Sequence, residues 1–135
     1  MAPDPLREWH RIVATGDASA IPALLAADVT FHSPVVHTPQ RGAAVTAGYL
    51  GAALQVFCND SFTYVREFRG DRSAVLEFVV QIDGIYVNGV DMIAWNEAGL
   101  IADFKVLLRP LKAVNLIHAK MGALLAAQPR HAPRA

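Results

Sequence analysis

Apolar residues in the first part of the chain recur at helical spacing. Leu6, Trp9 and Val13 fall on one face of a helix that ends at Gly16. The next apolar positions predict a second helix around residues 19–25.

A short strand and a third helix are predicted next. Residues 28–33 alternate between apolar and polar side chains and stop at Pro34, which is typical of a strand. Residues 35–41, which contain another proline, are expected to form a loop. Residues 42–57 predict a helix that carries no charged side chain.

The second half of the chain changes to the two-residue period of β-strands. The Asp83-Gly84 pair in this half is typical of a tight hairpin turn. Strands are predicted over residues 61–68, 73–82, 85–95 and 100–109, and a last helix over residues 111–127.

Helices followed by a run of strands predict an α+β fold, in which a curved antiparallel sheet wraps around the helices. The strands carry apolar residues on both faces, so a second subunit is expected to cover the face that the helices leave free. We therefore expect a homodimer formed through the sheet. Residues 1–127 are predicted to form a single domain, and residues 128–135 a flexible tail.

Composition narrows the class of protein. The chain has 135 residues, of which 53% are hydrophobic and 18% charged, and its formal net charge is zero. A chain this apolar is not disordered, and without a basic cluster no nucleic-acid partner is expected. The longest uncharged run, residues 42–59, is short for a membrane span of about 20 apolar residues, so no membrane partner is expected either.

Cys58 is the single cysteine, so an internal disulfide cannot form. Its surroundings show no cysteine–histidine spacing that would predict a metal site. A reduced, cytoplasmic setting fits this cysteine usage. The glycines fit turns better than a phosphate-binding loop, and no cofactor is predicted.

Asp91 is the most informative residue for function. It is the one carboxylate in an apolar stretch that runs from Gly89 to Trp95, and Ile93 shares its face of the strand. Apolar surroundings withhold water from a carboxylate, which raises its pKa toward the range that acid–base catalysis needs. The alternative is a structural carboxylate held by a nearby arginine or by backbone N–H groups.

Two histidines could act together with Asp91. His32 and His37 flank the mouth of the expected pocket, and a histidine can exchange protons near neutral pH. In the alternative interpretation, His32 lies on the outer surface and His37 caps a loop carbonyl.

A set of mostly large apolar side chains is predicted to line the pocket, although each could equally belong to the core: Trp9, Tyr49, Phe57, Leu76, Phe78, Phe104, Val106 and Leu108. The hydroxyl of Tyr49 could in addition orient a ligand. Glu77, the other carboxylate within an apolar strand, is expected to form an ion pair with Lys105 or Arg109 on the dimer side, and the alternative is that it faces the pocket beside Asp91.

The motifs that carry a family resemblance are Trp9, Gly16-Asp17, Leu24-Leu25, the stretch 28–34, Gly42, Gly89-Val90-Asp91 and the stretch 96–101. Their order resembles the nuclear transport factor 2-like superfamily, and most of all its SnoaL-like and ketosteroid-isomerase-like branch. The resemblance covers roughly residues 5–126 and implies a cone-shaped α+β fold with a deep apolar pocket, commonly in a dimer. The superfamily includes isomerases, cyclases, epoxide hydrolases and non-enzymes, so the resemblance alone does not set an activity.

The resemblance to ketosteroid isomerases implies that Asp91 takes the place of a protonated aspartate that helps hold the oxyanion. Ser33 stands in the place of their general-base aspartate, and Trp9 in the place of their catalytic tyrosine. Because two of these three positions differ, ketosteroid isomerase activity is not expected. The acid and arginine set of limonene epoxide hydrolases is not found either, since Lys105 or Val106 stands near the place of one acid.

The sequence therefore predicts a small-molecule pocket protein that performs cofactor-free acid–base chemistry on an apolar compound, as isomerases, cyclases, hydratases or hydrolases do. Asp91 is the predicted proton-exchanging group or oxyanion donor, and His37 or His32 is its partner. Tyr49 and Trp9 are predicted to orient the ligand. The alternative function is a non-catalytic ligand-binding or interaction domain of the same fold.

Overall fold

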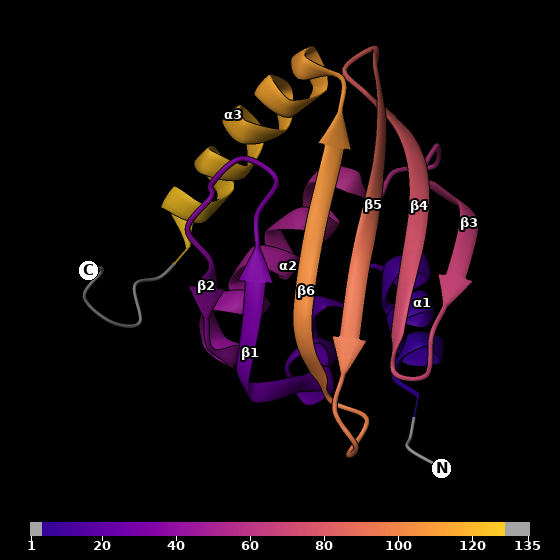
Figure 1. Cartoon of the computed structure of the whole chain (residues 1–135). Helices are drawn as coiled ribbons and strands as arrows, with labels where there is room; N and C mark the ends of the chain where they lie inside the picture. The colour runs from indigo at the N-terminus through magenta and orange to yellow at the C-terminus, as the bar shows by residue number, and fades with distance from the viewer. Residues whose placement is uncertain (1–3, 129–135) are drawn as a thin grey trace.

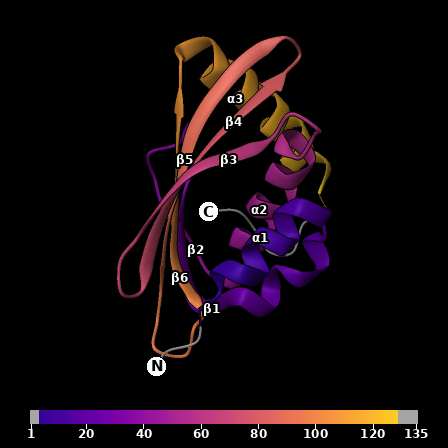
Figure 2. The same cartoon turned by 90° about the vertical axis from the view of Figure 1, so that its right-hand side faces the viewer.

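A curved sheet with helices packed against one of its faces makes up the computed structural model, which describes residues 4–128 (Figure 1). The six strands follow the order β2-β1-β6-β5-β4-β3 across the sheet. The elements are α1 (Leu6–Thr15), β1 (Leu25–His32), β2 (Gln40–Arg41), α2 (Ala43–Phe57), β3 (Thr63–Arg69), β4 (Ser73–Ile82), β5 (Ile85–Trp95), β6 (Ile101–Arg109) and α3 (Leu111–Ala127). The predicted α+β fold with a curved sheet is confirmed, and all three helices lie on the same side of it (Figure 2).

Strand alternation turns every second side chain of the central strands toward the helices. On β4 these are Leu76, Phe78 and Val80, and on the neighbouring β5 they include Ile93 and Trp95, all of them buried. The core of the protein therefore lies between the sheet and the helices, as the two-residue period predicts.

Gly89 allows two neighbouring strands to pack closely against β5. A Cβ atom at this position would lie 2.5 Å from Cζ of Phe78 and 2.7 Å from the carbonyl oxygen of Leu107. Only glycine fits between these atoms without a shift of the backbone. This close packing holds β5 against both neighbouring strands at Gly89, two residues before Asp91.

The region after α1 differs from the prediction. Instead of a helix around residues 19–25, the chain forms two short 3-10 turns, Ala18–Ala20 and Pro22–Leu24, and enters β1 at Leu25. Pro22 has no N–H with which to continue an α-helical ladder, which explains the break.

The sheet is mixed rather than wholly antiparallel. Strand β1 pairs with β6 in parallel and with β2 in antiparallel orientation. A parallel pair needs a long crossover connection, and α2 together with β3, β4 and β5 supplies it here. Strand β2 itself lies inside the segment 35–41 that was predicted to be a loop.

The outer face of the sheet, which the helices leave free, carries several exposed apolar side chains. Phe68 is 60% exposed, Leu107 50% and Met92 38%. The flexible tail predicted for residues 128–135 falls outside the described residues, apart from Gln128, whose amide donates to the carbonyl oxygen of Gly48. Within residues 4–128, no helix has both the length and the apolar character that a membrane crossing requires.

Candidate functional site

Asp91 lies in the middle of β5, on the face that the helices cover. Its direct neighbours across the sheet are Leu76 on β4 and Val106 on β6, and both are buried. Asp91 itself is only 6% exposed. The prediction that Asp91 shares a buried face with Ile93 and Trp95 is confirmed.

Tyr64, on the edge strand β3, is the hydrogen-bond partner of Asp91. Its hydroxyl donates to Oδ2 of Asp91 at 2.5 Å and accepts the indole N–H of Trp9 at 3.1 Å. Among residues 4–128 no arginine and no backbone N–H bonds the carboxylate, and its hydrogen-bond partner there is the Tyr64 hydroxyl. The two hydrogen bonds connect α1, β3 and β5.

The surroundings of Asp91 set its protonation near neutral pH. Burial raises the pKa of Asp91 from 3.8 to about 7, and the hydrogen bond from Tyr64 offsets part of that rise. Burial, together with the charge of Asp91, raises the pKa of Tyr64 well above its usual range, so the phenol keeps its proton and acts as a donor. The pair therefore holds one exchangeable proton, on Asp91.

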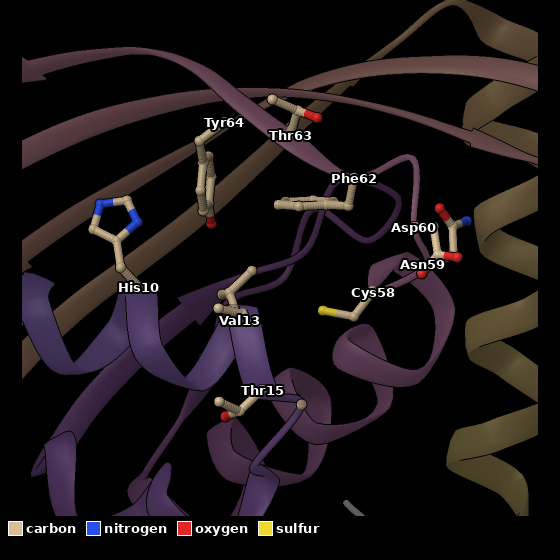
Figure 3. Close-up of a pocket in the computed structure, with 11 residues that line it drawn as sticks. His10, Val13, Thr15, Cys58, Asn59, Asp60, Phe62, Thr63 and Tyr64 are labelled. Atoms are coloured by element: carbon tan, nitrogen blue, oxygen red, sulfur yellow. The ribbon is translucent and has the colours of Figure 1, made fainter.

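Asp91 faces a narrow chamber of about 50 Å³, and a wider mouth of about 590 Å³ lies beside it. Val13, Cys58, Phe62 and Tyr64 line both spaces and so stand between them. Figure 3 shows these four side chains in the wall of the mouth. A cavity needs roughly 10–15 Å³ to hold one water molecule, so this chamber has room for the small end of a ligand.

The predicted wall residues divide into two groups. The chamber is lined by Trp9, Phe57, Phe78, Phe104 and Val106. The remaining three lie elsewhere. Tyr49 packs on the ring of Phe31 with 5.1 Å between ring centroids, Leu76 is fully buried in the core, and Leu108 packs between the two apolar clusters of the core.

The structure does not bring either predicted histidine to Asp91. His32 lies on the outer face of the sheet, because Phe31 faces inward, and its Nε2 is 2.9 Å from Oδ1 of Asp103. His37 is exposed in the loop between β1 and β2. Neither lines the chamber or the mouth, and Tyr64 stands where a histidine partner was expected.

Glu77 lies on the outer face in an ion pair, but with a partner that the sequence did not identify. Nε of Arg66 donates to its carboxylate at 2.6 Å, and the amide of Asn88 donates at 3.0 Å. A register shift between Tyr64 and Arg66 places Arg66 directly across from Glu77. This bulge lets Tyr64 face the pocket while Arg66 faces outward.

Phe62, Tyr64 and His10 are among the pocket residues that were not found from the sequence. Phe62 and Tyr64 are two positions apart in an alternating stretch, so the sequence does indicate that they share a face. That this face meets Asp91 depends on the strand order β5-β4-β3, which the pattern alone does not give.

Cys58 lines both the chamber and the mouth. Burial raises the pKa of its thiol, and the charge of Asp91 adds to this effect, so the thiol stays protonated near neutral pH. Among the residues that the structure describes, no group of three or more histidine, cysteine, aspartate or glutamate side chains is placed to hold a metal ion. Asp91 and Tyr64 are a hydrogen-bonded acid–phenol pair in the wall of the chamber.

A curved mixed sheet with helices on one face is the fold of the nuclear transport factor 2-like superfamily. Residues 6–104 match the family model of the SnoaL-like domain, so the chain belongs to the SnoaL-like family. A comparison with curated protein sequences found no match.

The chain is similar to two bacterial proteins of known structure over most of its length. A steroid delta-isomerase from Pseudomonas aeruginosa is 39% identical, with a TM-score of 0.86, and the match covers 90% of this chain and 89% of that one. An uncharacterised protein with a cystatin-like fold from Silicibacter pomeroyi DSS-3 is 37% identical, with a TM-score of 0.85 and coverage of 94% and 88%.

A third solved structure shares the fold at lower identity. The epoxide hydrolase/cyclase-like enzyme SalBIII, which acts in pyran ring formation in salinomycin, is 19% identical. Its TM-score is 0.62, over 77% of this chain and 87% of that one. This likeness concerns the fold alone.

The raised pKa of Asp91 predicts how stability depends on pH. Because the folded state binds the Asp91 proton more tightly than the unfolded chain, the free energy of unfolding falls as pH rises from about 4 to about 7. Asp91→Asn removes this ionisation. In urea unfolding, the free energy of unfolding of the variant should be higher than that of wild type by roughly 2 to 4 kcal/mol at about pH 8. The difference should be much smaller at about pH 4. The same difference at both pH values would contradict the burial of an ionisable Asp91.

Proposed function

We propose that the protein is a cofactor-free acid–base enzyme that moves a proton within a largely apolar small molecule. The observation that carries this proposal is the Asp91 carboxylate, whose pKa is raised to about 7 and which faces an apolar chamber with Tyr64 bonded to it. Near neutral pH such a group is present in both forms, so it can take up a proton and return it.

The proposed reaction moves a carbon–carbon double bond into conjugation with a ketone. Ionised Asp91 removes a proton from the carbon between the carbonyl and the double bond, and the electron pair shifts to the carbonyl oxygen to give a dienolate. Protonated Asp91 no longer needs the Tyr64 hydroxyl, which can then donate to that oxygen. Asp91 returns the proton to the far carbon of the double bond, and the carbonyl forms again.

Similarity to a named enzyme supports this reaction type over the cyclase, hydratase and hydrolase types. The Pseudomonas aeruginosa protein that is 39% identical is named a steroid delta-isomerase. In this chain Ser33 stands where ketosteroid isomerases have their base, and its hydroxyl accepts the backbone N–H of Val35 in a loop outside the pocket. Asp91 therefore carries the proton in both directions.

The small chamber favours a second candidate function, a non-catalytic ligand-binding domain of the same fold. About 50 Å³ beside Asp91 leaves little room for a whole substrate, although it suits the end of one. In that case Asp91 would bind a ligand without exchanging its proton, and turnover would be absent at every pH.

The base role of Asp91 predicts the pH dependence of turnover. With a β,γ-unsaturated cyclohexenone as probe, kcat/KM should rise with pH and level off above about 7, since only the ionised carboxylate removes a proton. The measurement is the ultraviolet absorbance of the conjugated product.

Two variants complete this test. Asp91→Asn should lower kcat/KM by about a hundredfold or more. Asp103→Asn, which alters a carboxylate on the outer face, should not change it. A rate that falls as pH rises would contradict the base role. Binding of the probe without turnover at any pH would favour the second candidate.

We also propose that a second copy of the chain covers the outer face of the sheet. Phe68, Met92 and Leu107 are exposed there. On the same face Arg66 and Glu77 form an ion pair within one chain, and His32 bonds to Asp103. An apolar face of this kind fits an isologous contact between two sheets.

A charge on this face should separate the two copies. Wild type should elute in size-exclusion chromatography with twice the mass of one chain, and Leu107→Glu should shift it to the mass of one chain. Leu111→Glu is the control, because Leu111 is 75% exposed on α3 and should leave the dimer intact. A wild type that elutes as a single chain at high protein concentration would rule the dimer out.

A further inference from the structure

His10 on α1 lies at the mouth of the pocket, and the proposed reaction does not use it. Its Nε2 is 2.9 Å from Oε1 of Glu67 on β3. The second oxygen of Glu67 accepts from Nε of Arg69 at 2.6 Å, and Arg69 in turn donates to Asp4 at 2.7 Å. This row of charged groups fixes the orientation of the imidazole ring.

The other ring nitrogen of His10 is free to meet a ligand. The imidazole packs edge-on against Tyr64, with 5.3 Å between ring centroids and an interplanar angle of 89°. Nδ1 lies on the side of the ring toward Tyr64, whereas Nε2 points away from it (Figure 3). Among residues 4–128, Nδ1 has no hydrogen-bond partner, and the side chain is 39% exposed.

The partner of Nε2 decides what Nδ1 can bind. The hydrogen bond from Arg69 lowers the pKa of Glu67, so its carboxylate is ionised and can only accept. Nε2 of His10 therefore donates to Glu67, and whenever the imidazole is neutral its Nδ1 is an acceptor. A ligand group that meets Nδ1 of the neutral ring has to donate a hydrogen bond.

We propose that His10 binds a hydroxyl group on the outward end of an elongated, largely apolar ligand whose inner end reaches Tyr64 and Asp91. The proposal rests on the proposed function and adds the class of ligand. A chamber of about 50 Å³ takes only the inner end, while the mouth of about 590 Å³, where His10 lies, takes the rest. The carboxylate of Glu67 bonds to His10 and Asp60 also lines the mouth, which disfavours an anionic outer end, and a hydroxyl is a neutral donor that suits a largely apolar ligand.

Three fused-ring phenols of matched shape test this proposal. They are a naphthol, the naphthalenediol with its second hydroxyl at the opposite end, and the monomethyl ether of that diol. Dissociation constants are measured by isothermal titration calorimetry at about pH 8, where histidine side chains are generally neutral. The diol should bind roughly threefold to tenfold more tightly than the naphthol and the ether, since it alone donates an outer hydrogen bond.

Two variants assign the advantage of the diol to His10. His10→Phe keeps an aromatic ring against Tyr64 but removes Nδ1, so the diol should bind no better than the naphthol, whose affinity should stay close to that of wild type. His118→Phe, at an exposed position on α3, should keep the full advantage. Asp91→Asn should weaken the binding of the diol and of the naphthol by the same factor.

The outcomes separate this proposal from the one on which it rests. Naphthol binding that depends on Asp91, with no advantage of the diol or with one that survives in His10→Phe, overturns the role of His10 alone. No binding of any of the three compounds, or binding that Asp91→Asn does not change, overturns both. An advantage that is lost in His10→Phe and kept in His118→Phe supports both.

Discussion

The pocket depends on one hydrogen bond, from the hydroxyl of Tyr64 to the carboxylate of Asp91. An ionised carboxylate loses much of its hydration when it is buried, and its proton is then held more tightly. The Tyr64 hydroxyl, a single donor at 2.5 Å, restores part of the stabilisation that the ionised carboxylate loses on burial. The pKa of Asp91 is then about 7. With several donors Asp91 would stay ionised. Without any donor its pKa would be higher still.

The fold supplies that donor from the edge of the sheet. A bulge after Tyr64 turns its side chain inward although Arg66, two residues on, faces outward. The ring of Tyr64 is then held between His10 and Phe62, with ring centroids at 5.3 and 5.0 Å, and Trp9 donates to its oxygen. Phe62, which packs on Tyr64, lines both the mouth and the chamber together with it, so the position of the Asp91 donor and the passage between the two spaces depend on one aromatic contact.

Local patterns in the sequence predicted most features that depend on one strand or one helix, although not the 3-10 turns before β1 or the short strand β2. The alternation of β5 places Asp91 on the buried face, and the order of helices and strands predicts the α+β fold. The partner of Asp91 was not predictable in this way, because Tyr64 is two strands distant and its direction depends on a bulge. His32 was predicted to act with Asp91 because it ends a strand near the expected pocket. Phe31 takes the inward position instead, so His32 lies on the outer face.

The central claim, that Asp91 is a buried carboxylate with a proton to exchange near neutral pH, is tested most directly by carbon NMR of the side-chain carboxyl groups during a pH titration. The signal that disappears in Asp91→Asn identifies the group. The account predicts a midpoint of about 7 for this signal and a higher midpoint in Tyr64→Phe, where the hydrogen bond is lost. A midpoint near the ordinary value of 3.8 would contradict it.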